Sequence, residues 1–289
     1  MARNATAQTA VGPQFLAAVE HNEEPQRRLV DDDLAASFLP AHLRALVRAT
    51  RSRRLREALI SSMDRHAPGT WASIACRKRY IDERISDPLN EFDAVVVLGA
   101  GLDTRAYRIA RHSNLPVFEV DQQVNIDRKA AAVRRALGDQ PPSVRLVAAD
   151  FERDDVMTAL TAHGYRPDAR TFFVCEGVTQ YLTPPAVPAL FTALHRAAPG
   201  STLIFTFVRQ DFIDGVNLYG AESLYRRFRQ KSQLWQTGFE PERLVDTLAE
   251  SGWRLIETAG PSYYRDTYIR GTGREVAASP IEWIAVAQR

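Results

Sequence analysis

Two glycines in one turn, and an acid further along the chain, are the residues whose types and spacing could bind a nucleotide-like ligand. Gly99 and Gly101 follow a β-branched apolar run, and Asp121 ends the next apolar run. Glycines let the backbone approach a ligand, and an acid at the end of a strand can accept hydrogen bonds from ribose hydroxyls. Residues 94–121 therefore predict a strand, a turn, a helix and a second strand, which make half of a mononucleotide-binding sheet.

The glycine turn departs from the pattern that binds dinucleotides. Thr104 occupies the third glycine position of G-x-G-x-x-G, and Asp103 would repel a phosphate. A ligand with an adenosine end and no phosphates suits this turn better, and S-adenosylmethionine is such a ligand. A nicotinamide-dependent oxidoreductase is therefore the less favoured interpretation.

Length and composition limit the classes of protein to consider. The 289 residues, 45% of them hydrophobic, can bury a full core in one domain or in one domain with an appendage. The net charge of +2 implies no highly charged polymer as a partner. Cys76 and Cys175 lie far apart, which favours a reduced, cytoplasmic setting over a disulfide framework. The N-terminus lacks a secretory signal and no apolar run approaches the roughly 20 residues of a membrane span, so we expect no membrane partner.

Apolar residues recur at helical spacing through residues 1–90, and prolines separate the helices. Six arginines lie between Arg44 and Arg56, a density that could indicate a nucleic-acid surface. Aromatic residues for base stacking are missing from this stretch. We therefore expect a solvated helix face and no nucleic-acid partner.

From residue 93 the pattern changes to apolar, β-rich runs that alternate with helical stretches. Strands are predicted at 94–98, 117–120, 144–148, 171–175 and 202–208, and helices at about 104–112, 123–137, 153–163 and 184–198. Thr183 before Pro184 predicts the N-cap of the last of these helices. Buried strands separated by single helices indicate a parallel, doubly wound sheet.

The alternation stops after Val208. Residues 209–239 form an insertion rich in aromatics and arginine, and a helix at 242–250 and strands at 253–258 and 281–287 are predicted to follow. A polar connection without a helix joins the last two strands, which should therefore pair antiparallel. Five parallel strands closed by such a pair form the Rossmann-like α/β sheet of class I methyltransferases. We expect a helical cap at 1–90, a cofactor-binding core at 91–208, a substrate lid at 209–240 and closing elements at 241–289.

Several stretches together resemble one family. They are LGAGLDTR at 98–105, FEVD at 118–121, ADF at 149–151 and CEGVTQYL at 175–182, with RLVDDDLA at 28–35 and RKRYID at 77–82. In combination they are similar to the leucine carboxyl methyltransferase family, including its bacterial branch with polyketide O-methyltransferases of the tetracenomycin type. The resemblance runs from about residue 5 to the end of the chain, and the insertion matches least clearly.

The resemblance implies a site for S-adenosylmethionine in which the glycine turn and the acid after it take part. Gly99, Ala100 and Gly101 would line the methionine portion of the cofactor. Asp121 would hold the ribose, because it is the final residue of its strand. Glu119 competes with Asp121 for that role.

The resemblance assigns the remaining contacts to the cofactor as well. Asp150 and Phe151 would flank the adenine, although Asp150 could instead cap the next helix. Glu176 would accept a hydrogen bond from the cofactor's ammonium, because an unpaired acid at the end of a buried strand would be costly. Arg77 would pair with the cofactor's carboxylate, which matches a guanidinium fork. Arg79 is the alternative, since the rotation of the helix decides between them.

The expected reaction is methyl transfer from a sulfonium, an in-line displacement that mainly requires positioning and the exclusion of water. A carboxylate acceptor is already ionised and needs no general base, whereas a phenol with a pKa near about 10 benefits from one. No histidine falls at the end of a predicted strand, and no histidine spacing suggests a metal. We therefore expect a small-molecule carboxylate as acceptor, for example on a polyketide or other secondary metabolite, with phenolic O-methylation as the alternative.

Residues at the acceptor side are less specific. Tyr181 and Thr179 fall near the expected transfer point, where packing or capping would explain them equally well. Arg209, Tyr219 and Tyr225 are candidates to hold an acidic or flat substrate, and a solvated, packed lid is the competing explanation. A non-enzymatic protein with a degenerate pocket is a third interpretation, which the intact glycines and acids disfavour. The acceptor and the oligomeric state stay open.

Overall fold

The computed structural model of the protein describes residues 11–87 and 89–289, so residues 1–10 and 88 of the expected cap lie outside it. The strands of the described chain are β1 (Ala94–Leu98), β2 (Val117–Asp121), β3 (Val144–Ala148), β4 (Thr171–Cys175), β5 (Thr202–Val208), β6 (Arg254–Ala259) and β7 (Glu282–Gln288). These seven form one sheet in the order β3-β2-β1-β4-β5-β7-β6. Strands β1 to β5 are parallel, and β7 pairs antiparallel with both β5 and β6. The predicted sheet of five parallel strands and a closing antiparallel pair is confirmed.

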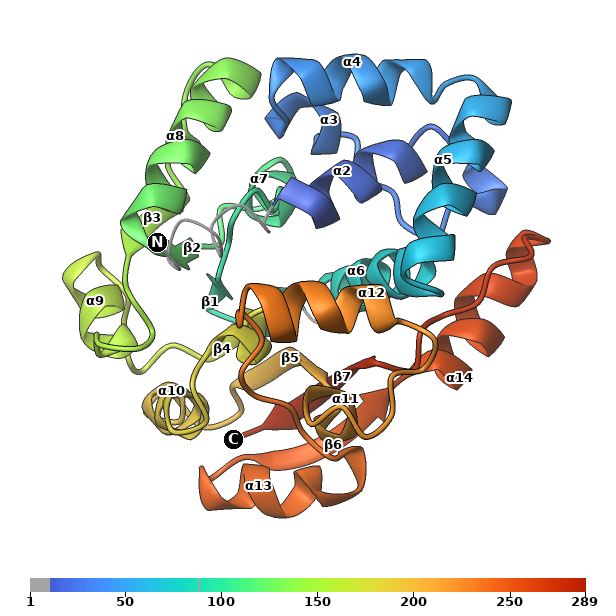
Figure 1. Ribbon diagram of the computed structural model, residues 1–289. Helices are drawn as coiled ribbons and strands as arrows, with labels where there is room; N and C mark the ends of the chain where they lie inside the picture. The colour runs from blue at the N-terminus through green and yellow to red at the C-terminus, as the bar shows by residue number, and fades with distance from the viewer. Residues whose placement is uncertain (1–10, 88) are drawn as a thin grey trace.

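Helices surround this sheet (Figure 1). Those that precede it are α2 (Val11–Glu20), α3 (Ala35–Phe38), α4 (Ala41–Ala49), α5 (Arg53–His66) and α6 (Thr70–Ser86). Those that follow β1 are α7 (Arg105–Ala110), α8 (Gln123–Leu137), α9 (Val156–Ala162), α10 (Ala186–Leu194), α11 (Gln210–Ile213), α12 (Glu222–Tyr225), α13 (Leu244–Glu250) and α14 (Pro261–Tyr264). Short 3₁₀ turns lie at Pro25–Arg27, Leu89–Glu91, Thr179–Tyr181, Pro241–Arg243 and Arg270–Thr272, and π-helical turns at Arg226–Lys231 and Arg265–Ile269.

Both faces of the central strands are buried. In β1, Val95 and Val97 belong to the apolar cluster that includes α2, α3 and α6. Val96 and Leu98 point to the opposite face and join the cluster of α9, α10 and α13. Because successive side chains of a strand alternate between faces, a strand covered on both sides needs an almost continuous apolar sequence. This explains why the apolar runs predicted the strands closely.

The connection between β6 and β7 differs from the predicted polar segment without a helix. It contains α14 and the π-helical turn Arg265–Ile269, in which Tyr264 and Tyr268 are buried. The Tyr268 hydroxyl donates to Glu83 on α6 at 2.6 Å, and the Arg79 guanidinium lies over the Tyr268 ring. Aromatic residues four apart share one helical face. Their packing against α6 makes this segment helical despite its polar composition.

The predicted N-cap of α10 is also wrong. The helix begins at Ala186 with Pro185 in the N-cap position, and the Thr183 hydroxyl donates to the Glu152 carboxylate at 2.8 Å instead. A residue that precedes a proline is disfavoured in the helical region. The consecutive prolines Pro184 and Pro185 therefore delay the start of the helix.

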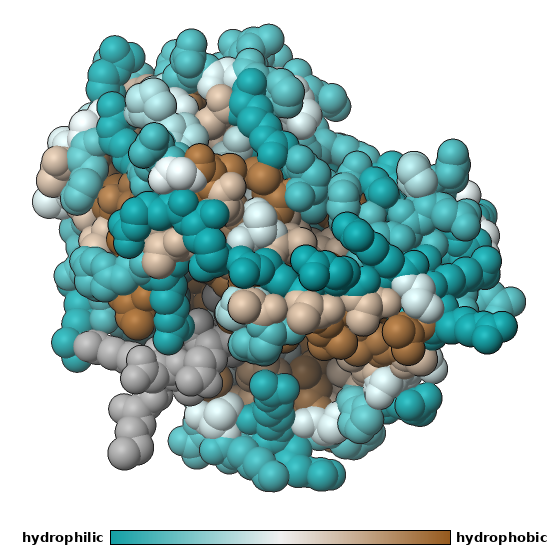
Figure 2. Space-filling model, turned by 90° about the horizontal axis from the view of Figure 1, so that it is seen from above, coloured by the Kyte–Doolittle hydropathy of each residue, from teal (hydrophilic) through white to brown (hydrophobic). Residues whose placement is uncertain are grey.

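The arginines between Arg44 and Arg56 lie mostly on exposed faces of α4 and α5, as predicted. Figure 2 looks onto this side of the molecule and shows a largely hydrophilic surface with apolar residues between the hydrophilic ones. Arg56 is an exception, because it is buried and its Nη2 lies 2.8 Å from the Glu23 carboxylate. Within residues 11–87 and 89–289, no helix is both long and apolar enough to cross a membrane.

A fully buried ion pair joins β2 to α8. The Lys129 ammonium lies 2.6 Å from a Glu119 oxygen and 2.6 Å from the Asp103 carbonyl oxygen, and the Tyr107 hydroxyl donates to the other Glu119 oxygen at 2.8 Å. Burial raises the pKa of Glu119, and Lys129 opposes that rise. The side chain of Glu119 is thus held in the interior by Lys129 and Tyr107.

Replacing Lys129 by Met should lower the free energy of unfolding by about 3–5 kcal/mol, because Glu119 would be left buried without its cation. Urea unfolding followed by circular dichroism measures this change. Arg134→Met, on the exposed face of the same helix, is the matched control and should change stability by less than about 0.5 kcal/mol. Equal stabilities for the two variants would contradict the importance of the pair.

Candidate functional site

The order of the strands brings distant parts of the chain to one edge of the sheet. β1 lies between β2 and β4, and the three strands are parallel, so their carboxyl ends meet. The glycine turn follows β1, Asp121 ends β2 and Glu176 follows β4. In open parallel sheets, ligands bind outside this edge where the strand order reverses.

The glycine turn is tied to the neighbouring strand. The backbone N–H groups of Gly99 and Ala100 both donate to the Val120 carbonyl oxygen, at 2.7 and 3.2 Å. Gly99 has a φ of +66° and Gly101 a φ of +45°, a region that favours glycine. The turn therefore has a fixed course beside the end of β2.

Asp121 braces this turn. Its carboxylate accepts hydrogen bonds from the backbone N–H of Gly101 at 2.8 Å, the N–H of Gln122 at 2.7 Å and the amide of Asn125 at 2.8 Å. Burial raises the pKa of Asp121, and these donors oppose the rise. An ionised carboxylate has about four acceptor positions. One of these acceptor positions is therefore open, whereas Glu119 is turned toward Lys129.

The side chain of Glu176, the residue directly after β4, is buried and faces three cations. Its carboxylate lies 3.0 Å from Arg77 Nε, 3.4 Å from Arg105 Nη2 and 3.5 Å from the Lys78 ammonium. Burial by itself would raise the pKa of Glu176, but Lys78, Arg77 and Arg105 hold it below its usual range. The carboxylate is therefore ionised and compensated inside the protein.

These contacts continue into a larger group, which we call the charge cluster. It consists of residues joined by ion pairs of 3.6 Å or shorter: Arg77, Lys78, Arg105, Arg108, Asp82, Asp103, Glu176 and Glu282. Burial would raise the pKa of Asp103, but Arg105 and Lys78 hold it well below its usual range. The cluster contains as many carboxylates as cations, so its charges compensate one another inside the protein.

The structure brings Arg77 to this site and keeps Arg79 away from it. Arg77 bonds Glu176 and also Glu282, at the start of β7. Arg79 is 40% exposed, pairs with Glu83 on its own helix at 2.8 Å and lies over Tyr268. The rotation of α6 therefore turns Arg77 inward and Arg79 outward.

Asp150 lies in the turn after β3. It is half-buried and accepts from the backbone N–H of Glu152 at 3.2 Å, and Phe151 packs against the apolar cluster of α9, α10 and α13. The next helix, α9, is capped by Asp155, which accepts from the N–H of Thr158 at 2.7 Å. The alternative in which Asp150 caps that helix is therefore wrong.

Thr179 and Tyr181 follow Glu176 in a short 3₁₀ turn. Thr179 is fully buried, and its hydroxyl donates to the Thr206 carbonyl at 2.8 Å, which ties the turn to β5. The Tyr181 ring meets the edge of Trp235 with 6.5 Å between ring centroids. Thr179 thus has a structural partner, and Tyr181 packs with the insertion.

The predicted substrate residues of the insertion pack among themselves. Arg209 Nε lies 3.2 Å from Asp211, and the Tyr219 hydroxyl donates to the same carboxylate. The Tyr225 ring stands edge-on against Phe212 with 5.7 Å between centroids. The structure therefore places these three side chains in the insertion and not in the charge cluster.

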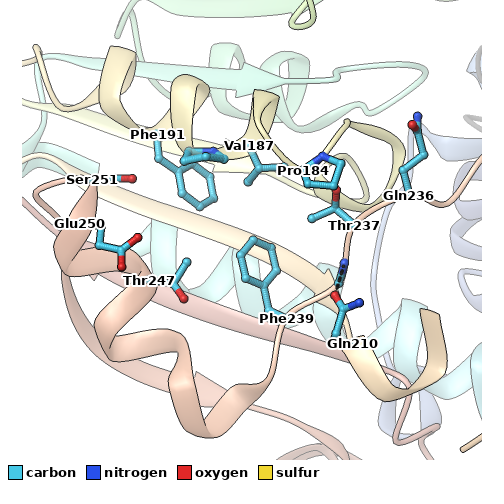
Figure 3. A pocket seen from close by; sticks show the side chains of 12 residues that line it. Pro184, Val187, Phe191, Gln210, Gln236, Thr237, Phe239, Thr247, Glu250 and Ser251 are labelled. Atoms are coloured by element: carbon cyan, nitrogen blue, oxygen red, sulfur yellow. Dashed lines mark hydrogen bonds between the residues drawn. The ribbon is translucent and has the colours of Figure 1, made fainter. Parts of the chain in front are cut away.

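A separate pocket of about 350 Å³ lies between α10, α13 and residues 236–239 (Figure 3). Val187 and Phe191 form one apolar wall, and Phe239 projects between the two helices. Glu250 is the one charged side chain among its lining residues. None of the predicted site residues lines this pocket, so it is distinct from the edge that holds the charge cluster.

Metal and thiol chemistry find no support in the described part of the chain. No group of three or more His, Cys, Asp or Glu side chains is placed to hold a metal ion there. Cys76 and Cys175 are buried and free, and burial raises the pKa of each to about 12. Such thiols are not nucleophiles near neutral pH.

Sequence reasoning missed several members of the charge cluster. Lys78 stands directly beside Arg77, and Arg105 directly follows the glycine turn, so both were within reach of the motifs. No local sequence pattern indicated that Glu282 would be part of the site. It reaches Arg77 because β7 inserts between β5 and β6, an arrangement that only the order of the strands discloses.

Comparison with known proteins identifies the family to which the chain belongs. The sequence profile of the leucine carboxyl methyltransferase family matches residues 10–195. A relative from Mycolicibacterium paratuberculosis is 32% identical over 213 residues, which cover 73% of this chain and 63% of that protein. A relative from Mycobacterium avium is 36% identical over 197 residues, 63% of this chain and 61% of the relative. Both are named as S-adenosyl-L-methionine-dependent methyltransferases, and the chain spans less than two thirds of their length.

Solved structures agree on the fold. A methyltransferase from Thermobifida fusca superposes with a TM-score of 0.56 at 16% identity, covering 81% of this chain and 88% of its own. An S-adenosylmethionine-dependent methyltransferase from Mesorhizobium loti has a TM-score of 0.51 at 14% identity, covering 73% and 96%. The predicted class I methyltransferase fold is thereby confirmed. With the sequence profile, the motifs and this fold in agreement, the chain belongs to the leucine carboxyl methyltransferase family.

Proposed function

We propose that this protein uses S-adenosylmethionine to methylate a carboxylate oxygen of a small molecule, for example a polyketide or another secondary metabolite. The observation that carries the proposal is the meeting of the glycine turn, Asp121 and the ionised Glu176 at one edge of the sheet. Family membership and the names of the relatives support the cofactor.

The site suits a zwitterionic ligand without phosphates. A Cβ on Gly99 would come within 2.3 Å of Val178 Cγ2, so the turn is packed closely and presents bare backbone. The charge cluster offers buried groups of both signs to an ammonium and a carboxylate. A pyrophosphate would instead meet the ionised carboxylates of Asp103 and Glu176.

The proposed contacts follow from this placement. Gly99, Ala100 and Gly101 line the methionine portion, and Asp121 receives a ribose hydroxyl at its open acceptor position. Glu176 accepts from the ammonium.

The other proposed contacts hold the two ends of the ligand. Asp150 and Phe151 flank the adenine in the turn after β3. Arg77 reaches the carboxylate with its Nη2, which lies beside Gly177. The cofactor supplies an electrophilic methyl group on its sulfonium, and the protein has to orient the acceptor and keep water out.

The acceptor side favours a group that is already ionised. Thr179 donates its hydroxyl to a backbone carbonyl, and both thiols have raised pKa values. A carboxylate needs no proton removed before it attacks. We assign residues 209–240 as the lid over this acceptor, with Tyr225 in its wall. Arg209 and Tyr219 share Asp211, so an acidic substrate reaches them by displacing that carboxylate.

Gly99→Ala should both destabilise the protein and weaken binding of S-adenosylhomocysteine. The left-handed φ costs about 1–2 kcal/mol for a non-glycine residue, and the clash with Val178 adds about 1–3 kcal/mol. Gly220→Ala is the matched control, since Gly220 has a φ of +73° and nothing within 4 Å of an added Cβ. Thermal unfolding and calorimetric titration measure the two effects. If Gly99→Ala loses no more stability and affinity than Gly220→Ala does, the turn at Gly99 is not closely packed.

Products formed with methyl-labelled cofactor and candidate acids should release labelled methanol in mild alkali, because methyl esters hydrolyse there and methyl ethers do not. Scintillation counting of the volatile fraction gives the answer. If the label stays with an alkali-stable product, the acceptor is not a carboxylate but the alternative, a phenolic hydroxyl.

The pH dependence separates the same two acceptors. A carboxylate with a pKa near about 4 is fully ionised above pH 6, so kcat/KM should be level between about pH 6 and 9. A phenol would instead give a rate that climbs with pH toward its pKa of about 10. Initial rates are measured across this pH range, and the affinity for S-adenosylhomocysteine is measured in parallel. The affinities show whether a change in rate comes from ionisation of the acceptor or from a change in cofactor binding.

A further inference from the structure

We infer that Lys78 is an exchangeable cation, which compensates Glu176 in the free protein and pairs with the cofactor's carboxylate in the complex. The inference rests on the proposed function, because it assumes that the methionine end of S-adenosylmethionine enters the charge cluster. It assigns a positioning role to a residue that neither the motifs nor the family resemblance singled out.

The lengths of its contacts set Lys78 apart from the two arginines at Glu176. The Lys78 ammonium lies 3.5 Å from Glu176 and 3.6 Å from Asp103. These distances are long for direct hydrogen bonds. Arg77 lies 3.0 Å from Glu176, and the same guanidinium also donates to Glu282. Lys78 is therefore held to the cluster mainly by Coulomb attraction.

Arg105 is anchored more firmly still. Its Nε and Nη1 each lie 2.6 Å from a carboxylate oxygen, of Asp82 and Asp103 respectively. A guanidinium that bridges two carboxylates would break hydrogen bonds on both sides if it moved. Lys78 would lose no such bond, since its ammonium makes no direct hydrogen bond to the described residues. Of the three cations at Glu176, Lys78 moves at the lowest cost.

Burial makes the position of Lys78 unusual. The residue is only 5% exposed, and its ammonium carries three donors. Lys129 is buried to a similar degree and makes two contacts of 2.6 Å, to Glu119 and to the Asp103 carbonyl. The loosely held ammonium of Lys78 thus has unused hydrogen-bonding capacity directly beside the proposed cofactor site.

Charge compensation explains why the exchange is favourable. An ammonium that arrives at Glu176 finds three cations already there, so one of them has to withdraw. A withdrawn cation left without an anion inside the protein would be strongly destabilising. The methionine end carries its own carboxylate, and a lysine on a flexible four-carbon stem can follow it. Every buried charge then faces a charge of opposite sign both before and after binding.

The test is a thermodynamic cycle that measures the coupling between the Lys78 side chain and the carboxylate of the ligand. Calorimetric titration is carried out with S-adenosylhomocysteine and with its decarboxylated analogue, which keeps the ammonium and lacks the carboxylate. Wild type, Lys78→Met, Lys78→Arg and Arg79→Met are compared. Arg79→Met is the control, since Arg79 is charged and on the same helix but faces Glu83 and Tyr268.

The inference predicts that removing the Lys78 charge weakens only the ligand that carries a carboxylate. Lys78→Met should weaken S-adenosylhomocysteine by about 10- to 100-fold, the range for a lost hydrogen bond between charged groups. It should leave the decarboxylated analogue unchanged or bind it more tightly, because a competitor for Glu176 is gone. Lys78→Arg should keep most of the affinity for S-adenosylhomocysteine, and Arg79→Met should match wild type with both ligands.

Each contrary result has a distinct meaning. Equal weakening of both ligands by Lys78→Met would show a purely structural role and overturn the inference, as would unchanged affinity for S-adenosylhomocysteine. If Lys78→Met does not fold, Lys78→Gln takes its place, because a neutral amide also removes the charge at this position and must weaken S-adenosylhomocysteine while sparing the decarboxylated analogue. Wild type that binds neither ligand would overturn the proposed function together with the inference.

Discussion

The ionised carboxylate of Glu176, buried at the end of β4, is the constraint on which the site depends. A carboxylate in this position would take up a proton unless cations compensated it. Arg77 and Lys78 come from α6 and Arg105 from α7, so the helices on one side of the sheet have to dock before the acid can stay charged. The helices before β1 thus provide electrostatic compensation as well as apolar packing.

The same requirement links the closing strands to the site. Glu282 begins β7 and bonds Arg77, which also bonds Glu176 across the sheet edge. The antiparallel strand β7 therefore helps to orient a guanidinium that belongs to the first third of the chain. The pairing of β7 with β5 and the course of α6 are both needed to bring these three charges together.

The insertion is organised by different forces. Its aromatic residues pack in an apolar cluster that also includes Val208 of β5 and Ile281, with Phe228 stacked on Trp235 at 4.7 Å between centroids. The Ser223 hydroxyl donates to the His66 carbonyl at the end of α5, so the insertion also touches the helices before the sheet. It is anchored at its two ends, where Arg209 bridges to Phe239 beside β5. The insertion is therefore held by aromatic packing together with its contacts to α5 and β5.

The sequence by itself determined the strands, the glycine turn and the family, because buried parallel strands need continuous apolar runs and the turn needs glycine at positive φ. It also placed Asp121, Glu176 and Arg77 among the candidates. Tertiary structure decided between Arg77 and Arg79 through the rotation of α6, and it turned Glu119 toward Lys129. It alone disclosed Glu282 and the loose contacts of Lys78, since ion pairs between residues about 100 or 200 positions apart leave no local pattern in a sequence.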